Sequence, residues 1–341
     1  MKAAIVNPYL DTLGGGERYT MAVAVALSKV GYKVDVEWEE ELIKSKLEDR
    51  FGIKLREINF VKDVRRGDGY EVCFWVSDGS IPTLRARKNL LHFQVPFKGV
   101  RGKNLMNKMK LYRIQKVICN SEFTKSVVDR EYGFGEKSVV VYPPVDIEKF
   151  RPKKKKENVI LYVGRFSELA QSKRQDVLIR VFRRINLVDW KLILAGGVEV
   201  GADRYLKKLK KMASGKNIEI VESPGFESLR DLYAQAKIFW SASGYGVDEE
   251  KEPMRVEHLG ITPIEAMSAG AVPVIFAAGG HRETVKDGRN GFLWKTKNGL
   301  RIKTRRLIND PKLMNRIARA AKMESKKYSY ERFEKEIIDL L

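Results

Sequence analysis

Two glutamates, Glu257 and Glu265, lie eight positions apart in the segment EHLGITPIEAMSAG and offer the clearest chemistry in this sequence. Between them, Gly260 predicts a turn, Thr262 a helix N-cap and Pro263 the first helical residue. The first N–H groups of a helix lack backbone partners and lie at the positive end of its dipole, so they attract phosphate groups. The segment therefore predicts an anion site at the Gly260 turn, with a carboxylate on each side of the molecule that carries the phosphate.

The same spacing also fits a purely structural role. In a capping box, Thr262 caps the helix and the Glu265 carboxylate bonds back to the N–H group of Thr262. For these two residues the sequence leaves both interpretations open.

Arg165 and Lys173 are candidate phosphate ligands in the second half of the chain. Arg165 follows a predicted strand, and Lys173 comes eight residues later, before the next predicted helix. The carboxyl ends of parallel strands are where α/β sheets bind ligands. Arginine offers a fork of donors for phosphate oxygens and lysine a compact charge. The alternative is solvated surface charge, and Lys173 could be confused with its neighbour Arg174.

The first half of the chain contributes a glycine turn and a histidine. The glycines at 14–16 separate a predicted strand from a helix, and glycine lets the backbone approach a ligand closely. No Gly-Lys-Ser/Thr follows, so this turn is not a P-loop. His92 lies in the predicted strand Leu90–Gln94. A histidine in an apolar strand is usually a core residue, which is the alternative to a role in the site.

The composition and charge of the chain indicate what kind of partner it binds and where in the cell it is expected. The net charge of +21 favours an anionic partner, either nucleic acid, acidic lipid or a phosphorylated substrate. No apolar run approaches the roughly 20 residues of a membrane span, and the N-terminal run MKAAIVNPYL is too short for a secretory signal. We therefore expect a cytoplasmic protein. Cys73 and Cys119 lie in apolar runs and predict buried free thiols, and no metal-ligand spacing is present.

Strand and helix signals alternate along the chain, which predicts an α/β protein with parallel sheets covered by helices. In the first half we expect strands at Ala3–Asn7, Lys33–Glu37, Val72–Ser77, Leu90–Gln94, Val117–Asn120 and Val139–Tyr142. The pattern restarts with strands at Val159–Val163, Lys191–Ala195, Ile218–Val221, Ile238–Ser241 and Val272–Phe276. Helices are expected near Arg174–Ile185, Arg204–Met212, Ser228–Ala236, Pro263–Ser268 and Tyr330–Leu341. A polar, basic stretch at 151–156 predicts a linker between two domains.

Short motifs in a fixed order carry a family resemblance: GGGER at 14–18, NSEFT at 120–124, YPPVD at 142–146, VGRF at 163–166, KRQD at 173–176, EHLGITPIEAMSAG at 257–270, GGHRE at 279–283 and DGRNGF at 287–292. Together they resemble the family 4 glycosyltransferases, retaining sugar-nucleotide enzymes of the GT-B fold. The histidine after the first glutamate, with Gly-Ile two residues later, resembles the mannosyltransferases that build lipid-linked oligosaccharides.

The resemblance implies a GT-B fold, in which two Rossmann-like domains face each other across a cleft. Residues 1–150 would form the N-terminal domain on the acceptor side. Residues 151–325 would form the C-terminal domain that binds the nucleotide-sugar donor. Residues 326–341 would form a helix that returns to the N-terminal domain.

The resemblance also implies roles for the candidate residues. Glu257 would contact sugar hydroxyls and Glu265 the ribose hydroxyls, while Arg165 and Lys173 would hold the donor diphosphate. His92 would face the transferred sugar. The stretch 259–262 would act through its backbone. The remaining donor-binding candidates are Gly15 and Gly16 of the glycine turn, and His258, Leu259, Gly260, Ile261 and Thr262.

The implied reaction moves a hexose, preferably mannose, from a GDP- or UDP-linked donor to a glycan or lipid-linked acceptor. No metal or other cofactor is expected. A soluble transferase of the sucrose- or glycogen-synthase type is the alternative within enzymes. A nucleic-acid-binding protein is the alternative suggested by charge, although no helix-turn-helix, zinc-finger or aromatic RNA-binding signature supports it. A sugar-nucleotide sensor without turnover is also compatible with binding motifs.

Residues 85–116 hold ten Lys or Arg and no acidic residue, interleaved with apolar side chains. One interpretation is an exposed basic helix. The other is a segment that meets an anionic membrane surface, where each basic residue adds about 1 kcal/mol. The second would place the protein peripherally on the cytoplasmic membrane face, which suits a membrane-anchored acceptor.

Overall fold

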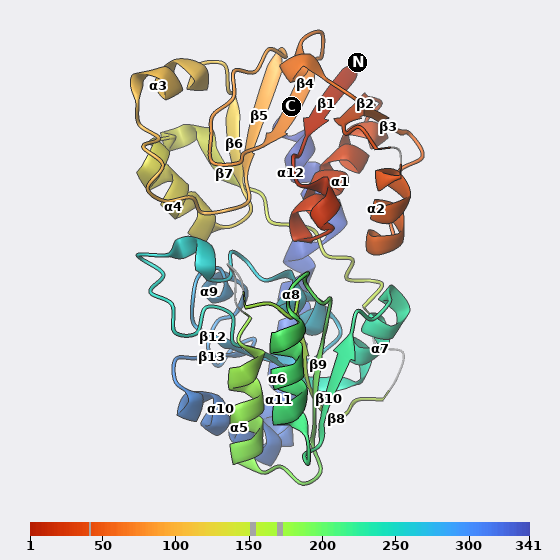
Figure 1. The fold of residues 1–341 in the computed structure, drawn as a ribbon, viewed down its shortest axis with the longest axis vertical. Coiled ribbons are helices and arrows are strands. Elements are labelled where there is room, and N and C mark those ends of the chain that lie inside the picture. Colours follow the sequence, from red (N-terminus) through yellow and green to blue (C-terminus); the bar gives the residue numbers. More distant parts are fainter. Residues whose placement is uncertain (41, 151–154, 169–172) are drawn as a thin grey trace. The chain divides into compact units, whose positions relative to one another are not determined.

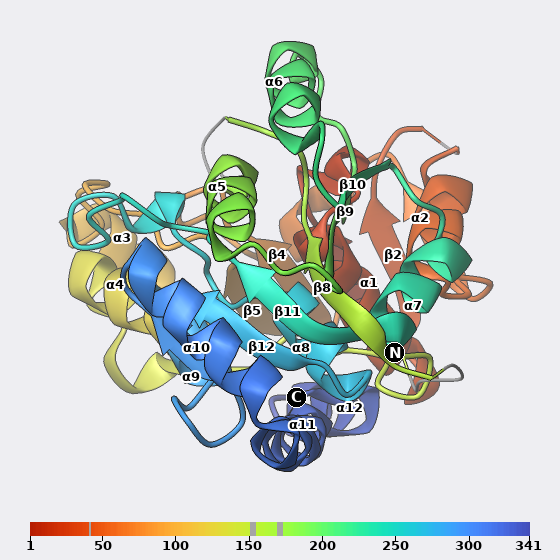
Figure 2. The same cartoon turned by 90° about the horizontal axis from the view of Figure 1, so that it is seen from below.

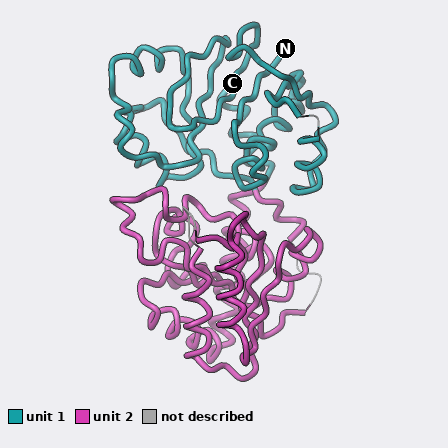
Figure 3. The backbone as a smooth tube through the Cα atoms, viewed as in Figure 1, with its two compact units in different colours: residues 1–144, 330–341 teal, residues 145–329 magenta. Residues whose placement is uncertain are grey.

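The computed structural model describes residues 1–40, 42–150, 155–168 and 173–341. The chain divides into two compact units, residues 1–144 with 330–341 and residues 145–329, shown in teal and magenta in Figure 3. Each unit is an α/β structure built on its own parallel sheet. The linker predicted at 151–156 lies mostly outside the described residues and stays a prediction.

Unit 1 contains, among its described residues, a seven-stranded sheet in the order β3-β2-β1-β4-β5-β6-β7. Its strands are β1 Lys2–Val6, β2 Lys33–Glu37, β3 Ile58–Val61, β4 Val72–Val76, β5 Lys88–Phe93, β6 Lys116–Cys119 and β7 Ser138–Val140. Its helices are α1 Gly15–Lys29, α2 Ile43–Phe51, α3 Leu105–Leu111, α4 Glu122–Tyr132 and α12 Tyr330–Ile338. All strand pairs are parallel, which fits their nearly continuous apolar runs.

Unit 2 contains, within the described part of the chain, a six-stranded parallel sheet in the order β10-β9-β8-β11-β12-β13. Its strands are β8 Glu157–Val163, β9 Lys191–Gly196, β10 Ile218–Glu222, β11 Ala236–Ser241, β12 Val272–Phe276 and β13 Phe292–Trp294. Its helices are α5 Gln175–Ile185, α6 Asp203–Ala213, α7 Phe226–Gln235, α8 Ile261–Ser268, α9 His281–Thr284, α10 Lys297–Asn309 and α11 Pro311–Ser325. Figure 2 shows α5 and α6 on one face of this sheet and α8 with α11 on the other.

Both sheets have a topological switch point, where consecutive connections leave in opposite directions. In unit 1 the chain runs from β1 outward to β3 and then returns to β4, on the other side of β1. In unit 2 the same reversal occurs between β8 and β11. Ligands of open α/β sheets bind at the carboxyl ends of the strands beside such a point. The fold therefore places one favoured binding edge in each unit.

The end of the chain completes the core of unit 1. Helix α12 packs beside α1, as Figure 1 shows, and buries Phe333 and Ile337 in that core. The ring of Phe333 meets the ring of Tyr19 edge-on, with centroids 5.0 Å apart. Lys29 of α1 also pairs with Glu334 of α12. The last residues of the sequence are thus part of the N-terminal unit.

The predicted strands all exist, with ends shifted by a few residues, and Cys73 and Cys119 are buried free thiols as expected. Two edge strands, β3 and β13, were not predicted. Both are short, at four and three residues, so neither shows a periodic apolar pattern. Helices α10 and α11 were also not predicted, since their hydrophobic positions are interrupted by many basic residues.

Candidate donor site

The N-terminus of α8 begins one residue after a glycine turn. Gly260 is the N-cap, with φ of 93° in the left-handed region that favours glycine. The prediction that Thr262 caps this helix is therefore wrong, and so is the capping box between Thr262 and Glu265. Because the turn at Gly260 already starts the helix, Ile261 is the first helical residue and Pro263 the third, where its missing N–H is not needed. The helix end at which the sequence predicts an anion site is present, two residues earlier than expected.

Lys173 and Glu257 meet beside this helix end. Lys173 Nζ donates to Glu257 Oε2 at 2.8 Å, and the two side chains are only 14% and 18% exposed. Burial alone would raise the pKa of Glu257. The charge of Lys173, followed by that of His281, outweighs it and lowers the pKa to about 2. Glu257 is thus an ionised hydrogen-bond acceptor at neutral pH, and Lys173 supplies a positive charge next to the predicted phosphate site.

The backbone of Glu257 is held by the glycine pair at 279–280. The Gly280 N–H group donates to the Glu257 carbonyl at 2.9 Å. A Cβ added at Gly279 would lie 2.2 Å from that same carbonyl oxygen, so only glycine fits this close approach. The GGHRE motif therefore positions the segment that carries Glu257.

His281 follows that glycine pair and is fully buried beside Gly260. Its Nδ1 lies 2.8 Å from the Phe276 carbonyl oxygen, so Nδ1 carries the proton in the neutral ring. Its Nε2 has no hydrogen-bond partner among the described residues. A Cβ built on Gly260 would lie 3.1 Å from the His281 ring. Burial lowers the pKa of His281, against the opposing pull of Glu257. The motif GGHRE at 279–283 contributes to the family resemblance, but no signal in the sequence predicts a role for His281.

Glu265 and His258 make contacts of a structural kind. Glu265 is buried, and its Oε2 accepts a hydrogen bond from the Tyr233 hydroxyl at 2.7 Å. His258 is buried, with its Nε2 3.2 Å from the Met254 carbonyl oxygen. Leu259 is buried as well, so the backbone is the part of this stretch that is available to a ligand. The ribose contact of Glu265 stays a prediction.

Arg165 makes its described contacts with residues other than Lys173 and Glu257. Its guanidinium is half-exposed and pairs with Glu199 at 3.5 Å, while its carbonyl accepts from the Gln175 side chain at 2.8 Å. The second contact ties the end of β8 to the start of α5. The segment between Arg165 and Lys173 includes 169–172, which lie outside the described residues. No described contact joins Arg165 to Lys173.

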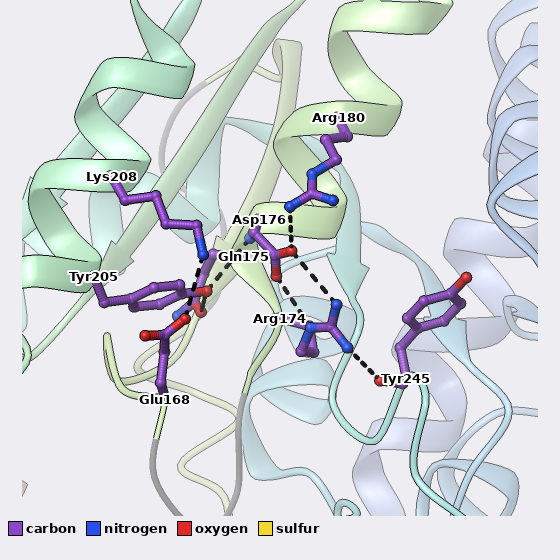
Figure 4. A network of polar contacts seen from close by, with 8 residues as sticks. All are labelled: Glu168, Arg174, Gln175, Asp176, Arg180, Tyr205, Lys208 and Tyr245. Atoms are coloured by element: carbon purple, nitrogen blue, oxygen red, sulfur yellow. Dashed lines mark hydrogen bonds and ion pairs between the residues drawn. The ribbon is translucent and has the colours of Figure 1, made fainter.

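Arg174, the next residue after Lys173, belongs to a different network of hydrogen bonds, which Figure 4 shows. Its Nε donates to Asp176 Oδ1 at 3.1 Å and its guanidinium donates to the Tyr245 carbonyl at 2.8 Å. Arg180 also donates to Asp176, at 2.9 Å. Arg174 holds the backbone at the start of α5, and it does so with φ of 52° in the left-handed region. Lys173 is therefore the residue that pairs with Glu257, whereas Arg174 joins the start of α5 to Tyr245.

The segment 243–250 is acidic and rich in glycine. In the structure it is tied down at both ends. Arg174 holds the carbonyl of Tyr245, and Glu249 Oε2 accepts from the Gly279 N–H group at 2.7 Å. The segment thus links the start of α5 to the glycine pair that positions Glu257.

The glycine turn of unit 1 opens α1. Gly14 is the N-cap, and its N–H group donates to Glu17 Oε2 at 2.7 Å. Gly15 and Gly16 form the first turn of the helix. A Cβ added at Gly16 would lie 2.5 Å from the Gln94 amide nitrogen, so the Gln94 side chain rests on the Gly16 backbone. The glycine turn therefore lies against the carboxyl end of β5.

His92 lies in β5 and is fully buried. Its ring stacks on Tyr19, with centroids 4.2 Å apart, and its Nδ1 is 3.1 Å from the Ile118 carbonyl oxygen. Its Nε2 has no hydrogen-bond partner in the described part of the chain. Burial lowers the pKa of His92 to about 4, so the ring is neutral at pH 7. Its role toward the transferred sugar stays a prediction, and in that role it would act as a neutral hydrogen-bonding group.

Neither a membrane-spanning helix nor a metal-binding cluster occurs in the described part of the chain. No helix there combines the length and the apolar character needed to cross a bilayer. No group of three or more His, Cys, Asp or Glu side chains among those residues is arranged to hold a metal ion.

Comparison with known proteins decides the family. The sequence model described as Glycosyl transferases group 1 matches residues 145–324, which is more than half of the chain. The chain belongs to the group 1 glycosyltransferases. The match covers the whole of unit 2 except its last residues, and it includes Arg165, Lys173, Glu257 and Glu265. The chain is therefore an enzyme of glycosyl transfer, and the family predicted from the motifs is confirmed.

The sequence relatives agree with this group 1 assignment, and the solved structures agree with the fold. The chain is 28% identical to an uncharacterised glycosyltransferase of Methanocaldococcus jannaschii over 64% of its length, and spans 56% of that relative. It is 23% identical to the α-1,3/1,6-mannosyltransferase ALG2 of Yarrowia lipolytica, over 84% of this chain and 79% of that one. A glycosyltransferase from Rickettsia africae superposes with a TM-score of 0.79 at 18% identity, covering 99% of this chain and 97% of that one.

The Anabaena protein HepE, solved in complex with UDP, superposes with a TM-score of 0.77 at 17% identity, over 99% of both chains. These likenesses confirm the predicted α/β fold of the GT-B class, with two Rossmann-like domains.

Proposed function

We propose that this glycosyltransferase moves mannose, with retention, from GDP-mannose to a glycan or lipid-linked acceptor. The observation that carries the proposal is the buried pair of Lys173 and Glu257 at the N-terminus of α8. A helix end and a lysine suit a diphosphate, while an ionised carboxylate suits the hydroxyls of a sugar. These three features at one point match the two halves of a nucleotide sugar.

The bond changes balance without a further reactant. The C1–O bond to the diphosphate breaks, and the acceptor oxygen forms a new bond to C1 on the same face of the sugar. The proton of the acceptor hydroxyl passes to the leaving diphosphate oxygen. Such a reaction depends mainly on stabilising the negative charge that builds up on the diphosphate. Lys173 and the N–H groups at the start of α8 would supply that stabilisation.

The choice of mannose rests on the relatives. Two fungal relatives are named α-1,3/1,6-mannosyltransferases, at 23% and 27% identity. A glycogen synthase of Geotalea daltonii also matches, at 31% identity over 38% of this chain, and HepE was solved with UDP-glucose. A UDP-linked glucose donor is therefore the second candidate.

The test is a donor panel on the purified protein. Thermal shift with GDP, UDP and ADP identifies the base, since a ligand that binds the folded state raises the melting temperature. Release of the nucleoside diphosphate from each sugar conjugate then measures turnover. We expect selective stabilisation by GDP and turnover of GDP-mannose. Glu257→Ala should abolish turnover while GDP still binds, because Glu257 acts on the sugar. No shift with any nucleotide in a folded sample would contradict the donor site.

We further propose that α3 docks the protein on an anionic membrane surface. Four large apolar side chains in and beside this helix are exposed, namely Leu105 at 75%, Met106 at 66%, Met109 at 70% and Tyr112 at 89%. Figure 1 shows α3 at the edge of unit 1. The four side chains belong to the segment 85–116, which holds ten basic residues and no acidic one. An apolar face framed by basic residues is typical of an interfacial helix, and it would bring the enzyme to a lipid-linked acceptor.

Vesicle sedimentation tests this docking. The protein should bind vesicles of phosphatidylcholine with phosphatidylglycerol more strongly than phosphatidylcholine alone. The variant Leu105→Ser, Met109→Ser, Tyr112→Ser should lose that binding. Val188, Val200 and Met323 of unit 2 are exposed at 83%, 97% and 63%, so the triple serine variant there is a matched control. Equal loss in both variants, or no binding by the wild type, would reject the proposal.

A further inference from the structure

Tyr162 of β8 carries a buried hydroxyl that no described residue satisfies. The side chain is 1% exposed and belongs to the apolar core of unit 2. Its Oη atom has no hydrogen-bond partner in the part of the chain that the structure describes. A buried polar group without a partner costs free energy comparable with a lost hydrogen bond, and each such group in a native protein calls for an explanation. A phenylalanine would pack at this position without that cost.

The hydroxyl lies at the carboxyl end of its strand. A Cβ added at Gly164 would lie 2.2 Å from Tyr162 Oη, so the hydroxyl reaches the backbone that follows Val163, the last residue of β8. Gly164 is itself tied to the neighbouring strand, because its N–H group donates to the Ala195 carbonyl at 2.9 Å. The carboxyl end of β8 flanks the switch point of this sheet, where open α/β sheets bind ligands.

The charges of two donor-site candidates act on this hydroxyl. Burial raises the pKa of Tyr162 well above its ordinary value, the Glu257 carboxylate raises it further, and Arg165 opposes both. The hydroxyl is therefore protonated at neutral pH and able to donate a hydrogen bond. The charge of Lys173 offsets the burial of Glu257 and keeps that carboxylate ionised. Tyr162 is thus an unpaired donor within electrostatic reach of the buried ion pair.

We infer that the Tyr162 hydroxyl hydrogen-bonds a hydroxyl of the transferred hexose and so helps to select the sugar of the donor. A tyrosine hydroxyl can donate to a sugar hydroxyl, whereas the Glu257 carboxylate can only accept from one. The two side chains would therefore recognise the sugar with complementary polarity. Because Tyr162 Oη is closed off in the free protein, it gains this partner only when the bound donor displaces a neighbouring side chain. The inference rests on the proposed function, which puts the sugar beside Glu257.

Two measurements on the variant Tyr162→Phe separate this role from packing. The melting temperature of the free protein should not fall, because the variant removes an unpaired hydroxyl and keeps the ring. In calorimetry, the affinity for GDP-mannose should fall about five- to tenfold, as expected for a lost hydrogen bond to the sugar. The affinity for GDP, which lacks the sugar, should change by less than about twofold. UDP-glucose and UDP form a second pair of ligands that is measured in the same way.

Tyr205→Phe is the matched control, because the Tyr205 hydroxyl is paired within the same unit. It donates to Gln175 Oε1 at 3.0 Å and accepts from the Asp176 N–H group at 3.4 Å (Figure 4). Removing this hydroxyl should lower the melting temperature by about 2–4 °C. It should leave the ratio of the affinities for GDP-mannose and GDP unchanged, because Tyr205 has no assigned contact with the sugar.

Three results for Tyr162→Phe would overturn the inference: a lower melting temperature, an unchanged affinity for the nucleotide sugar, or an equal loss of affinity for the nucleotide and its sugar conjugate. The last result would place the hydroxyl against the nucleotide. If the wild type binds the UDP pair and not the GDP pair, the proposed donor is wrong, and Tyr162 is judged on the UDP pair. If it binds none of the four ligands, the donor site itself is contradicted, and this inference with it.

Discussion

Lys173 Nζ and Glu257 Oε2 lie 2.8 Å apart although 84 residues separate them in the sequence. Lys173 precedes α5, and Glu257 lies just before the turn that starts α8. The pair therefore joins the two helix starts that flank the switch point of the unit 2 sheet. Donor binding, turnover and part of the stability of unit 2 should depend on it.

The strength of this pair can be measured by a double-mutant cycle. Lys173→Met, Glu257→Gln and the double variant should show a coupling free energy of about 1–3 kcal/mol in urea unfolding, since both side chains are largely buried. The exposed pair of Lys208 and Glu168, at 3.5 Å with 50% and 56% exposure, is the control and should give about 0.2–1 kcal/mol. A coupling no larger than that of the control would show that the buried pair does not stabilise the fold.

Gly260 should be essential to donor binding because a side chain there would meet His281 and Glu257. Backbone strain alone should not have this effect. Gly260→Ala places a Cβ 3.1 Å from the His281 ring and 3.3 Å from Glu257 Cγ, at φ of 93°. Gly31→Ala is the matched control, because Gly31 has φ of 88° and nothing within 4 Å of its added Cβ. Both variants should lose about 1–3 kcal/mol of stability. Only Gly260→Ala should also weaken nucleotide binding in calorimetry, and equal affinities would contradict the site.

His281 should make nucleotide binding depend on pH. Burial lowers the pKa of His281 in the free protein, so its ring is mainly neutral at pH 7.5. A diphosphate at the start of α8 would favour the charged ring, and binding would then take up a proton. The affinity for GDP should therefore rise as the pH falls from about 7.5 to about 6, around the ordinary histidine pKa. The affinity of the His281→Asn variant for GDP should depend less on pH. GDP itself ionises equally in both measurements, so its contribution cancels when the two proteins are compared.

His92 should make the stability of unit 1 sensitive to mild acid. Its pKa is lowered from an ordinary 6.5 to about 4 by burial, so the unfolded chain binds a proton more readily. The contribution to stability is fully present above pH 6.5 and is lost as the pH falls toward 4. His92→Phe should flatten the unfolding free energy over that window. An identical pH dependence in both proteins, measured by urea unfolding from pH 7.5 to pH 4, would show that protonation of His92 is not responsible.

The parallel sheets could be predicted because many of their strands, such as VCFWV at 72–76 and VPVIF at 272–276, are nearly continuous apolar runs. The strands at 33–37 and 272–276 have the ends that were expected. The start of α8 could not be placed so well. Thr262 and Pro263 have the residue types of an N-cap and a first helical position, but the left-handed turn at Gly260 starts the helix before them. His281 and Glu257 lie beside this glycine, and the closeness of His281, 21 residues later in the chain, is not visible in the local sequence.

The sequence by itself determined the residue types of the donor site, the order of the motifs, and the family they resemble. A local run of residues carries its own periodicity, turn preference and charge, so these properties are readable one segment at a time. Only the tertiary structure decided that Lys173 and not Arg174 meets Glu257, that His281 is buried beside Gly260, and that α12 belongs to unit 1. Each of these depends on how distant segments pack, because side-chain partners are chosen by the sheet order and the crossovers.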